Sequence, residues 1–143
     1  MDLYADNILD HYRDPRNKSE SPITNDQSLF DVVHTEKNIS CGDEITVALD
    51  IENESIASIK WSGIGCAISQ AGMSILSEEI EGMSTAEILK MQKDDVYEML
   101  GVPIGPRRFK CALISLHTVK NALRKNAQEK PQSWLETVEM DEG

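Results

Sequence analysis

The sequence predicts an α+β fold, in which a small three-stranded antiparallel sheet has helices packed on it. Two observations predict this class. Apolar residues recur with helical spacing in the first dozen residues and again after position 66, whereas between positions 30 and 61 they alternate with polar residues as in half-buried strands. The chain has 143 residues and 40% hydrophobic content, which is enough for one domain with a single core.

The first predicted element is a helix over residues 2–12, because its apolar residues fall on one face. Pro15 follows and ends it, since proline disfavours helical geometry in the residue before it. We expect the polar residues 18–28 to form a loop. The apolar face of this helix consists of Leu3, Tyr4, Ile8, Leu9 and Tyr12.

Three strands are predicted next, around residues 30–34, 45–51 and 57–61. The turn-forming residues 52–55 separate the last two runs, so these strands should form an antiparallel hairpin within a meander. The alternating residues are Phe30, Val32 and His34 in the first strand, Ile45, Val47, Leu49 and Ile51 in the second, and Ala57, Ile59 and Trp61 in the third.

Helical spacing returns over residues 67–81, and Gly82 is the predicted stop. Ser84 and Glu87 then have the spacing of a capping box, which predicts the start of another helix. The remaining elements are a short helix at 96–100, a loop rich in helix breakers at 101–106, and a long helix with Leu113, Leu116, Val119, Ala122 and Leu123 on one side.

The chain is predicted to be a single domain over residues 1–127, followed by an acidic tail at 128–143 that we expect to be flexible. Its formal net charge of −11 argues against nucleic acid as a partner, because phosphate binding needs a basic surface. No apolar run approaches the roughly 20 residues that span a membrane. The acidic N-terminus lacks the pattern of a signal peptide, so we expect a cytoplasmic protein.

The three cysteines lie where a thiol would be a good metal ligand, and their odd number argues against a closed set of disulfides. Cys41 falls in a turn before the cleanest strand, and a positive φ at Gly42 would point Cys41 and Asp43 to the same side. Asp43 also fits a turn aspartate that accepts from nearby backbone amides. Three thiols and one carboxylate are enough to hold one tetrahedral metal ion or the edge of an iron–sulfur cluster.

Cys66 is predicted at a switch from strand to helix, directly after Gly63 and Gly65. At a helix N-terminus the unpaired amides and the helix dipole favour the thiolate form. The two glycines would also allow a second chain or a bulky cluster to approach the backbone. A sharp turn with an incidental cysteine is the structural alternative.

Cys111 is predicted to open the long helix, and basic residues including Arg108 and Lys110 precede it. Nearby cations favour the thiolate, which is the nucleophilic and metal-binding form, so this site suits acceptance of a sulfur atom. A solvated basic patch is the alternative.

The three histidines, His11, His34 and His117, are expected to be structural or exposed rather than ligands. The sequence contains no nucleophile–base constellation, phosphate loop or dinucleotide fingerprint, which argues against a hydrolase or an oxidoreductase.

The cysteine segments resemble the signature of the U-type iron–sulfur assembly proteins, the IscU, SufU and NifU N-terminal family, over about residues 3–125. Their order, spacing and flanking residues all agree with that signature. The segments that carry the resemblance are SCGD at 40–43, GIGCAIS at 63–69 and KCAL at 110–113, with ILDHY at 8–12 and PRN at 15–17.

The resemblance implies a scaffold or carrier rather than a catalyst. Such a protein accepts sulfur from a cysteine desulfurase and iron from a donor, assembles a labile [2Fe–2S] cluster and passes it to apo recipient proteins; family members also bind zinc at the same site. We expect a monomer or a weak homodimer. By motif match the ligands are Cys41, Asp43, Cys66 and Cys111, with Cys111 as the candidate persulfide acceptor, supported by Gly42, Gly63, Gly65, Arg108 and Lys110.

Two departures place the chain between branches of this family. Lys110 occupies the position where the IscU branch usually has histidine, and a basic residue there resembles the SufU branch. The insertion of SufU proteins between the last two cysteines is absent, because Cys66 and Cys111 are 111 − 66 = 45 positions apart. A zinc-dependent sulfur acceptor that activates the desulfurase is therefore the alternative function, and a structural zinc module is a third.

Overall fold

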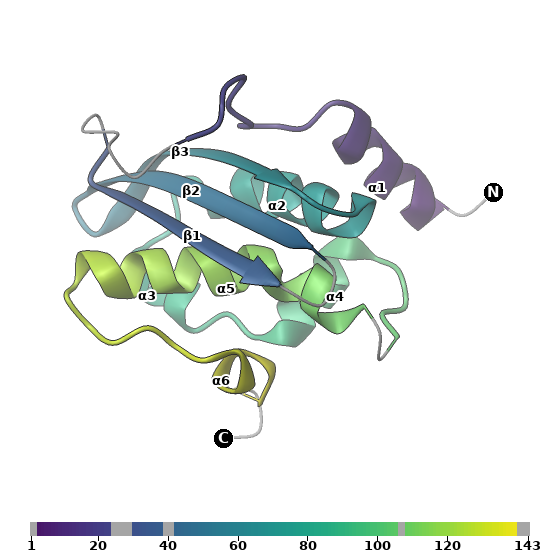
Figure 1. Ribbon diagram of the computed structural model, residues 1–143. Coiled ribbons are helices and arrows are strands. Elements are labelled where there is room, and N and C mark those ends of the chain that lie inside the picture. The colour runs from purple at the N-terminus through teal and green to yellow at the C-terminus, as the bar shows by residue number, and fades with distance from the viewer. Residues whose placement is uncertain (1–2, 24–29, 39–41, 106–107, 140–143) are drawn as a thin grey trace.

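The computed structural model describes residues 3–23, 30–38, 42–105 and 108–139. Within these ranges the elements follow the predicted order and confirm the α+β class (Figure 1). They are α1 (Leu3–Arg13), β1 (Val32–Asn38), β2 (Asp43–Glu52), β3 (Ser55–Ile64), α2 (Ala67–Ile80), α3 (Thr85–Leu89), α4 (Lys93–Leu100), α5 (Phe109–Asn126) and α6 (Trp134–Glu139).

The sheet has the strand order β1-β2-β3 and is antiparallel throughout, as the alternating runs predict. Ile45, Val47 and Leu49 of β2 are fully buried on the face that the helices cover. The β2–β3 hairpin turns at Asn53 and Glu54, which both adopt positive φ, the geometry that matches the twist of a two-residue hairpin.

The inward face predicted for the third strand is wrong at its first position. The pairing of β2 with β3 shifts between Asp50 and Ile51, so that Ile51 lies opposite Ile56. Ile56 is consequently 1% exposed, while Ala57 is exposed. An extra residue in one strand reverses the in–out alternation on one side of it, and strict alternation cannot predict where this occurs.

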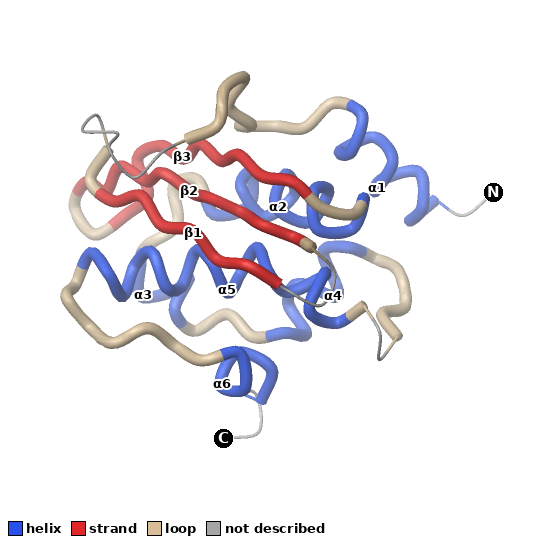
Figure 2. The backbone as a smooth tube through the Cα atoms, viewed as in Figure 1, coloured by secondary structure: helices blue, strands red, loops and turns tan. Residues whose placement is uncertain are grey.

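Helices α2 and α5 cover one face of the sheet, and α1 lies against α2 (Figure 2). The predicted capping box is confirmed, because Ser84 and Glu87 cap α3 reciprocally. Helix α4 begins at Lys93, three residues before the predicted start. The prediction missed the first turn because that turn is polar and carries no apolar periodicity. Helix α2 ends at Ile80, one residue before the predicted end, and Gly82 follows the C-cap residue Glu81 with φ +87°.

The C-terminal segment contains an element that the sequence analysis did not identify. Helix α6 packs on α5, where Trp134 stacks on the ring of His117 with centroids 4.0 Å apart. Thr137 is fully buried. The boundary at residue 127 and the flexibility of the tail remain predictions. Within the described ranges, no helix is long and apolar enough to cross a membrane.

Candidate metal centre

Three of the four predicted ligands converge at the end of the sheet where β1 and β3 finish and β2 begins. Asp43 is the first residue of β2, Cys66 is the N-cap of α2, and Cys111 lies in the first turn of α5. One ligand atom from each lies within 4.8 Å of the other two. Cys41 lies outside the described residues.

This spacing fits a metal ion. Zinc–sulfur bonds of about 2.3 Å and a zinc–oxygen bond of about 2.0 Å place tetrahedral ligand atoms about 3.5–3.8 Å apart. The three ligand atoms lie within 4.8 Å of one another, so small side-chain movements would bring them to that separation. Two sulfur donors also suit iron–sulfur chemistry better than they suit hard cations such as magnesium.

Asp43 is held in place by three neutral donors. It is 1% exposed, and its Oδ1 accepts from the backbone amide of Cys66 at 3.1 Å. Its Oδ2 accepts from the side-chain amide of Asn38 at 3.2 Å, and the hydroxyl of Ser69 lies 3.2 Å from Oδ1. The two interpretations of Asp43 from the sequence, a metal ligand and an acceptor for backbone amides, are therefore compatible. The carboxylate that accepts from the amide of Cys66 also faces two thiols.

The hydrogen bonds of Asp43 leave capacity for a further ligand. A carboxylate offers about four acceptor positions, and three donors approach this one. The hydroxyl of Ser69 also lies 2.9 Å from the carbonyl oxygen of Cys66, and its single proton can serve one acceptor at a time. Asp43 can therefore exchange the hydroxyl of Ser69 for another ligand without leaving that hydroxyl unsatisfied.

The glycines explain how the backbone makes room for this carboxylate. Gly65 has φ +147°, and a Cβ there would overlap the carboxylate of Asp43 and the hydroxyl of Ser69. A Cβ at Gly63 would meet the carbonyl oxygen of Glu44. Gly42 adopts the predicted positive φ of +74°, with open space around it. Gly65 is thus the glycine that the site itself requires.

The two described thiols differ in accessibility. Cys66 is partly exposed, and its side chain forms no cap for α2. Cys111 is 2% exposed and is the third residue of α5 rather than the first. The predicted role of Cys111 as sulfur acceptor remains a prediction, and it requires a reaction partner to reach a buried sulfur atom.

The two basic residues before Cys111 occupy different settings. Arg108 is exposed and forms the N-cap of α5 through its backbone, whose carbonyl accepts from the amide of Ala112. Lys110 is partly buried, and its ammonium lies 5.9 Å from the ring centre of Trp134 in α6. The cation nearest in sequence to Cys111 thus also contacts the C-terminal helix.

The histidines take part in other contacts of the described structure and are absent from its Asp43–Cys66–Cys111 group. His11 is 7% exposed, and its Nδ1 lies 2.7 Å from the hydroxyl of Ser74. Burial lowers the pKa of His11, with a contribution from Arg16. His34 and His117 both contact Glu36.

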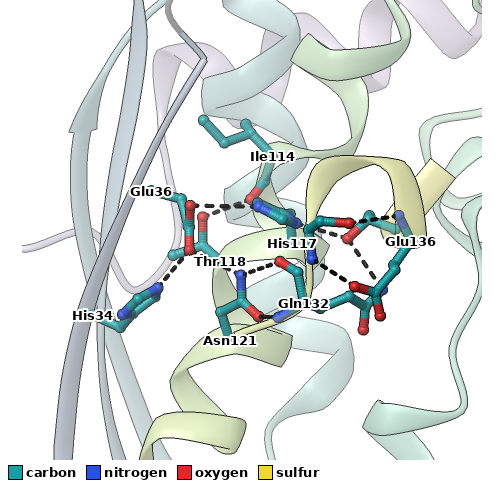
Figure 3. A network of polar contacts seen from close by, with 10 residues as sticks. His34, Glu36, Ile114, His117, Thr118, Asn121, Gln132 and Glu136 are labelled. Atoms are coloured by element: carbon teal, nitrogen blue, oxygen red, sulfur yellow. Dashed lines mark hydrogen bonds and ion pairs between the residues drawn. The ribbon is translucent and has the colours of Figure 1, made fainter. Parts of the chain in front are cut away.

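A second polar cluster lies between β1, α5 and the C-terminal segment, and the sequence analysis missed it (Figure 3). Glu36 contacts His34 at 2.7 Å, His117 at 3.4 Å and the amide of Asn121 at 2.9 Å. His117 continues the chain of contacts to the hydroxyl of Thr137 at 2.7 Å. Burial opposes ionisation of Glu36, but the bonds from the histidines and Asn121 outweigh it and lower its pKa.

Two further residues of the metal centre were also missed, namely Asn38 and Ser69, which hold Asp43. A signal existed for Ser69, because it follows Cys66 by three positions and so returns to the same face of α2. None existed for Asn38, whose approach to Asp43 depends on the register of β1 against β2.

Two thiols and a carboxylate gathered at one end of a helix-covered antiparallel sheet define a small α+β domain with a group that could hold a metal ion. The chain belongs to the NifU-like N-terminal domain family, whose sequence model matches residues 3–132. The family resemblance seen in the sequence is thereby confirmed.

Individual relatives carry names from both branches. The zinc-dependent sulfurtransferase SufU of Bacillus subtilis is 29% identical and aligns with 86% of this chain and 90% of its own length. The iron–sulfur cluster assembly scaffold protein IscU of Thermotoga maritima is 32% identical, over 86% of this chain and 94% of its own. A crystal structure from Fervidobacterium islandicum, described as a scaffold for the SUF system, matches with a TM-score of 0.65 and 27% identity, over 85% of this chain and 96% of that chain.

Proposed function

We propose that this protein is an iron–sulfur cluster assembly scaffold that holds a labile [2Fe–2S] cluster as cargo and hands it to apo recipient proteins. The observation that supports this most directly is the convergence of Asp43, Cys66 and Cys111 within 4.8 Å of one another, in a chain of the NifU-like N-terminal family. Cys41 completes the proposed ligand set.

The donor set favours release as well as binding. Thiolates are soft ligands that suit iron–sulfur clusters and zinc, whereas a carboxylate is harder and binds sulfide-bridged iron less well. Asp43 also has competing partners in the amide of Cys66 and the hydroxyl of Ser69. We infer that Asp43 keeps the cargo exchangeable, because its oxygen can return to these donors when the metal leaves.

Sulfur would arrive from a cysteine desulfurase, and iron from a separate donor. In the sulfur step the Cys111 thiolate attacks the terminal sulfur of the desulfurase persulfide. A new S–S bond forms at Cys111, the original S–S bond breaks, and the desulfurase cysteine leaves as a thiolate. Since Cys111 is 2% exposed, this step requires the first turn of α5 to open towards the partner.

A zinc-dependent sulfur acceptor is the second candidate, and Lys110 is the observation that favours it. The family relative from Bacillus subtilis is named a zinc-dependent sulfurtransferase. In this role zinc orders the ligands, and the sulfur is handed onward from Cys111 without a stable cluster.

The iron, zinc and acid-labile sulfide of protein purified anaerobically from its own cells test the proposal. Near-equal iron and sulfide, lost in a Cys66→Ser variant and retained in a Glu44→Gln control, supports the scaffold. Glu44 is the matched control because it follows Asp43 directly and its exposed side chain pairs with Lys37. About one zinc per chain without sulfide contradicts the scaffold. Persulfide on Cys111 after incubation with a desulfurase and cysteine then decides for the second candidate.

A further inference from the structure

A groove of about 410 Å³ opens on the helix layer, between the end of α2 and helices α3 and α4. None of its lining residues belongs to the metal centre. Glu79 lies 79 − 66 = 13 residues beyond Cys66, which is about 20 Å along a helix. The lining residues are Glu79, Met83, Glu87, Lys90, Met91, Asp95, Glu98 and Met99.

The apolar part of the groove is made of methionines. Met83, Met91 and Met99 line it, and they are three of the six methionines in the chain. Met91 is 9% exposed, and the other two are partly buried against the main core. Methionine side chains are flexible and polarisable, so they can fit apolar side chains of different shapes.

The α3–α4 connection that carries Met91 is held by a hydrogen bond from α5. The ammonium of Lys120, which is fully buried in α5, donates to the backbone carbonyl of Met91. Burial lowers the pKa of Lys120 to about 8. The floor is therefore a fixed part of the fold, and its methionine side chains supply the adaptability.

The rim of the groove is acidic. Glu79, Glu87, Asp95 and Glu98 are all exposed, and Lys90 is the cation among the eight lining residues. Four carboxylates and one ammonium leave a formal charge of −3 around an apolar floor. Glu87 and Asp95 also cap α3 and α4, which holds these two carboxylates in place.

We propose that this groove docks a basic amphipathic segment of a partner protein, with the apolar side chains on the methionines and lysine or arginine side chains on the acidic rim. Charge complementarity selects this occupant. An anionic membrane surface or a nucleic acid would be repelled by the rim, and an acidic segment would meet four carboxylates. The groove has room for a few aliphatic side chains, as a helix laid into it would provide.

A designed peptide pair tests the chemistry of the occupant on the full chain. The basic probe is a helix of about 15 residues with leucines at i, i+3, i+4 and i+7 and lysines elsewhere, and its counterpart carries glutamates in place of the lysines. We expect the basic probe to bind about tenfold or more tightly than the acidic one in fluorescence anisotropy, with affinity falling as salt rises. Equal binding of the two probes would overturn the proposal.

Charge-reversal variants test the location. Glu79→Lys with Glu98→Lys should weaken binding of the basic probe about tenfold, since neither residue caps a helix. The matched control is Glu20→Lys with Glu52→Lys, which changes the net charge equally at exposed positions outside the groove. If control and groove variants weaken binding equally, the attraction belongs to the whole acidic chain and the proposal is wrong.

A site-resolved measurement separates this inference from the proposed function. Amide chemical shifts should change in α3, α4 and the end of α2 when the basic probe binds, and those of Cys66 and Cys111 should not. Cys111→Ser should leave probe binding unchanged. Shift changes centred on the metal centre would overturn the groove assignment while leaving the scaffold proposal intact.

Discussion

Two acidic side chains reach the helix layer from adjacent strands of the same sheet, and they serve different ends. Asp43 begins β2 and accepts from neutral donors, while its carboxylate faces two thiols. Glu36 lies on β1, where it is held by His34, His117 and Asn121, with 20% of its side chain exposed. Both are fixed by side chains from other elements.

The comparison shows that the donors around a carboxylate decide its role. Neutral amides and a hydroxyl position Asp43 without compensating its charge, so it keeps an attraction for a cation. Glu36 also has three partners, two imidazoles and an amide, but these contacts connect β1 to α5 and, through His117 and Thr137, to α6 (Figure 3). We therefore interpret Asp43 as a ligand and Glu36 as a structural residue.

The largest expected effect comes from closing the space beside Asp43. Gly65→Ala should abolish metal retention and lower the free energy of unfolding by about 2–4 kcal/mol, because the new Cβ overlaps Asp43 and Ser69 at an unfavourable φ and the backbone must shift at Cys66, the next residue. Metal analysis and denaturant titration measure both quantities. Gly82→Ala is the control, since it also has positive φ but open space. Normal metal content in Gly65→Ala would contradict this account of the site.

Removing Glu36 should separate stability from metal binding. Glu36→Ala leaves His34, His117 and Asn121 without their shared acceptor, so we expect the free energy of unfolding to fall by about 2–3 kcal/mol. Metal content per folded chain should not change. Glu44→Ala, on the neighbouring strand, should cost less than about 0.5 kcal/mol, because its ion pair is exposed. A loss of metal in Glu36→Ala would mean that the two clusters are coupled.

Removing Asp43 should change metal release as well as stability. Asp43→Ala should slow metal release to a chelator about tenfold, which corresponds to about 1.4 kcal/mol, and should lower stability by about 1–2 kcal/mol through the donors left unpaired. Stopped-flow chelation and denaturant titration provide the two readouts. Unchanged or faster release would contradict the inference that Asp43 keeps the cargo exchangeable.

The smallest expected effect is the acid dependence of the Glu36 cluster. The pKa of Glu36 is lowered on folding from an ordinary value of 4.5, so the unfolded chain binds protons first as pH falls. The stability that this cluster contributes is therefore complete above pH 4.5 and is lost below it. In Glu36→Gln this part of the pH profile should disappear when unfolding is followed from pH 7 to pH 3. A profile identical to that of the unchanged chain would assign the acid sensitivity to other carboxylates.

Much of the candidate metal centre was predictable because each proposed ligand lies beside a local signal. Glycine marked the turns at Gly42 and Gly65, and the switch from strand to helical spacing placed Cys66 at a helix start. The residues that hold Asp43 were harder to predict. Asn38 and Ser69 reach it from separate elements, and polar residues at such positions are common on the surfaces of strands and helices.

The Glu36 cluster shows the same limit over a longer range. Glu36 and Asn121 are 85 residues apart, and the hydroxyl of Thr137 comes from a helix that the sequence analysis treated as tail. The exposure of Ala57 likewise depends on a register shift between two paired strands.

The sequence by itself determined the order of helices and strands, the family and the identity of the proposed ligands, because these follow from periodicity, turn residues and local motifs. The tertiary structure decided which donors surround each carboxylate, that α6 packs on α5, and that methionines and carboxylates from three helices form one groove. These outcomes depend on strand register and on contacts between residues far apart in the chain, which local patterns do not encode.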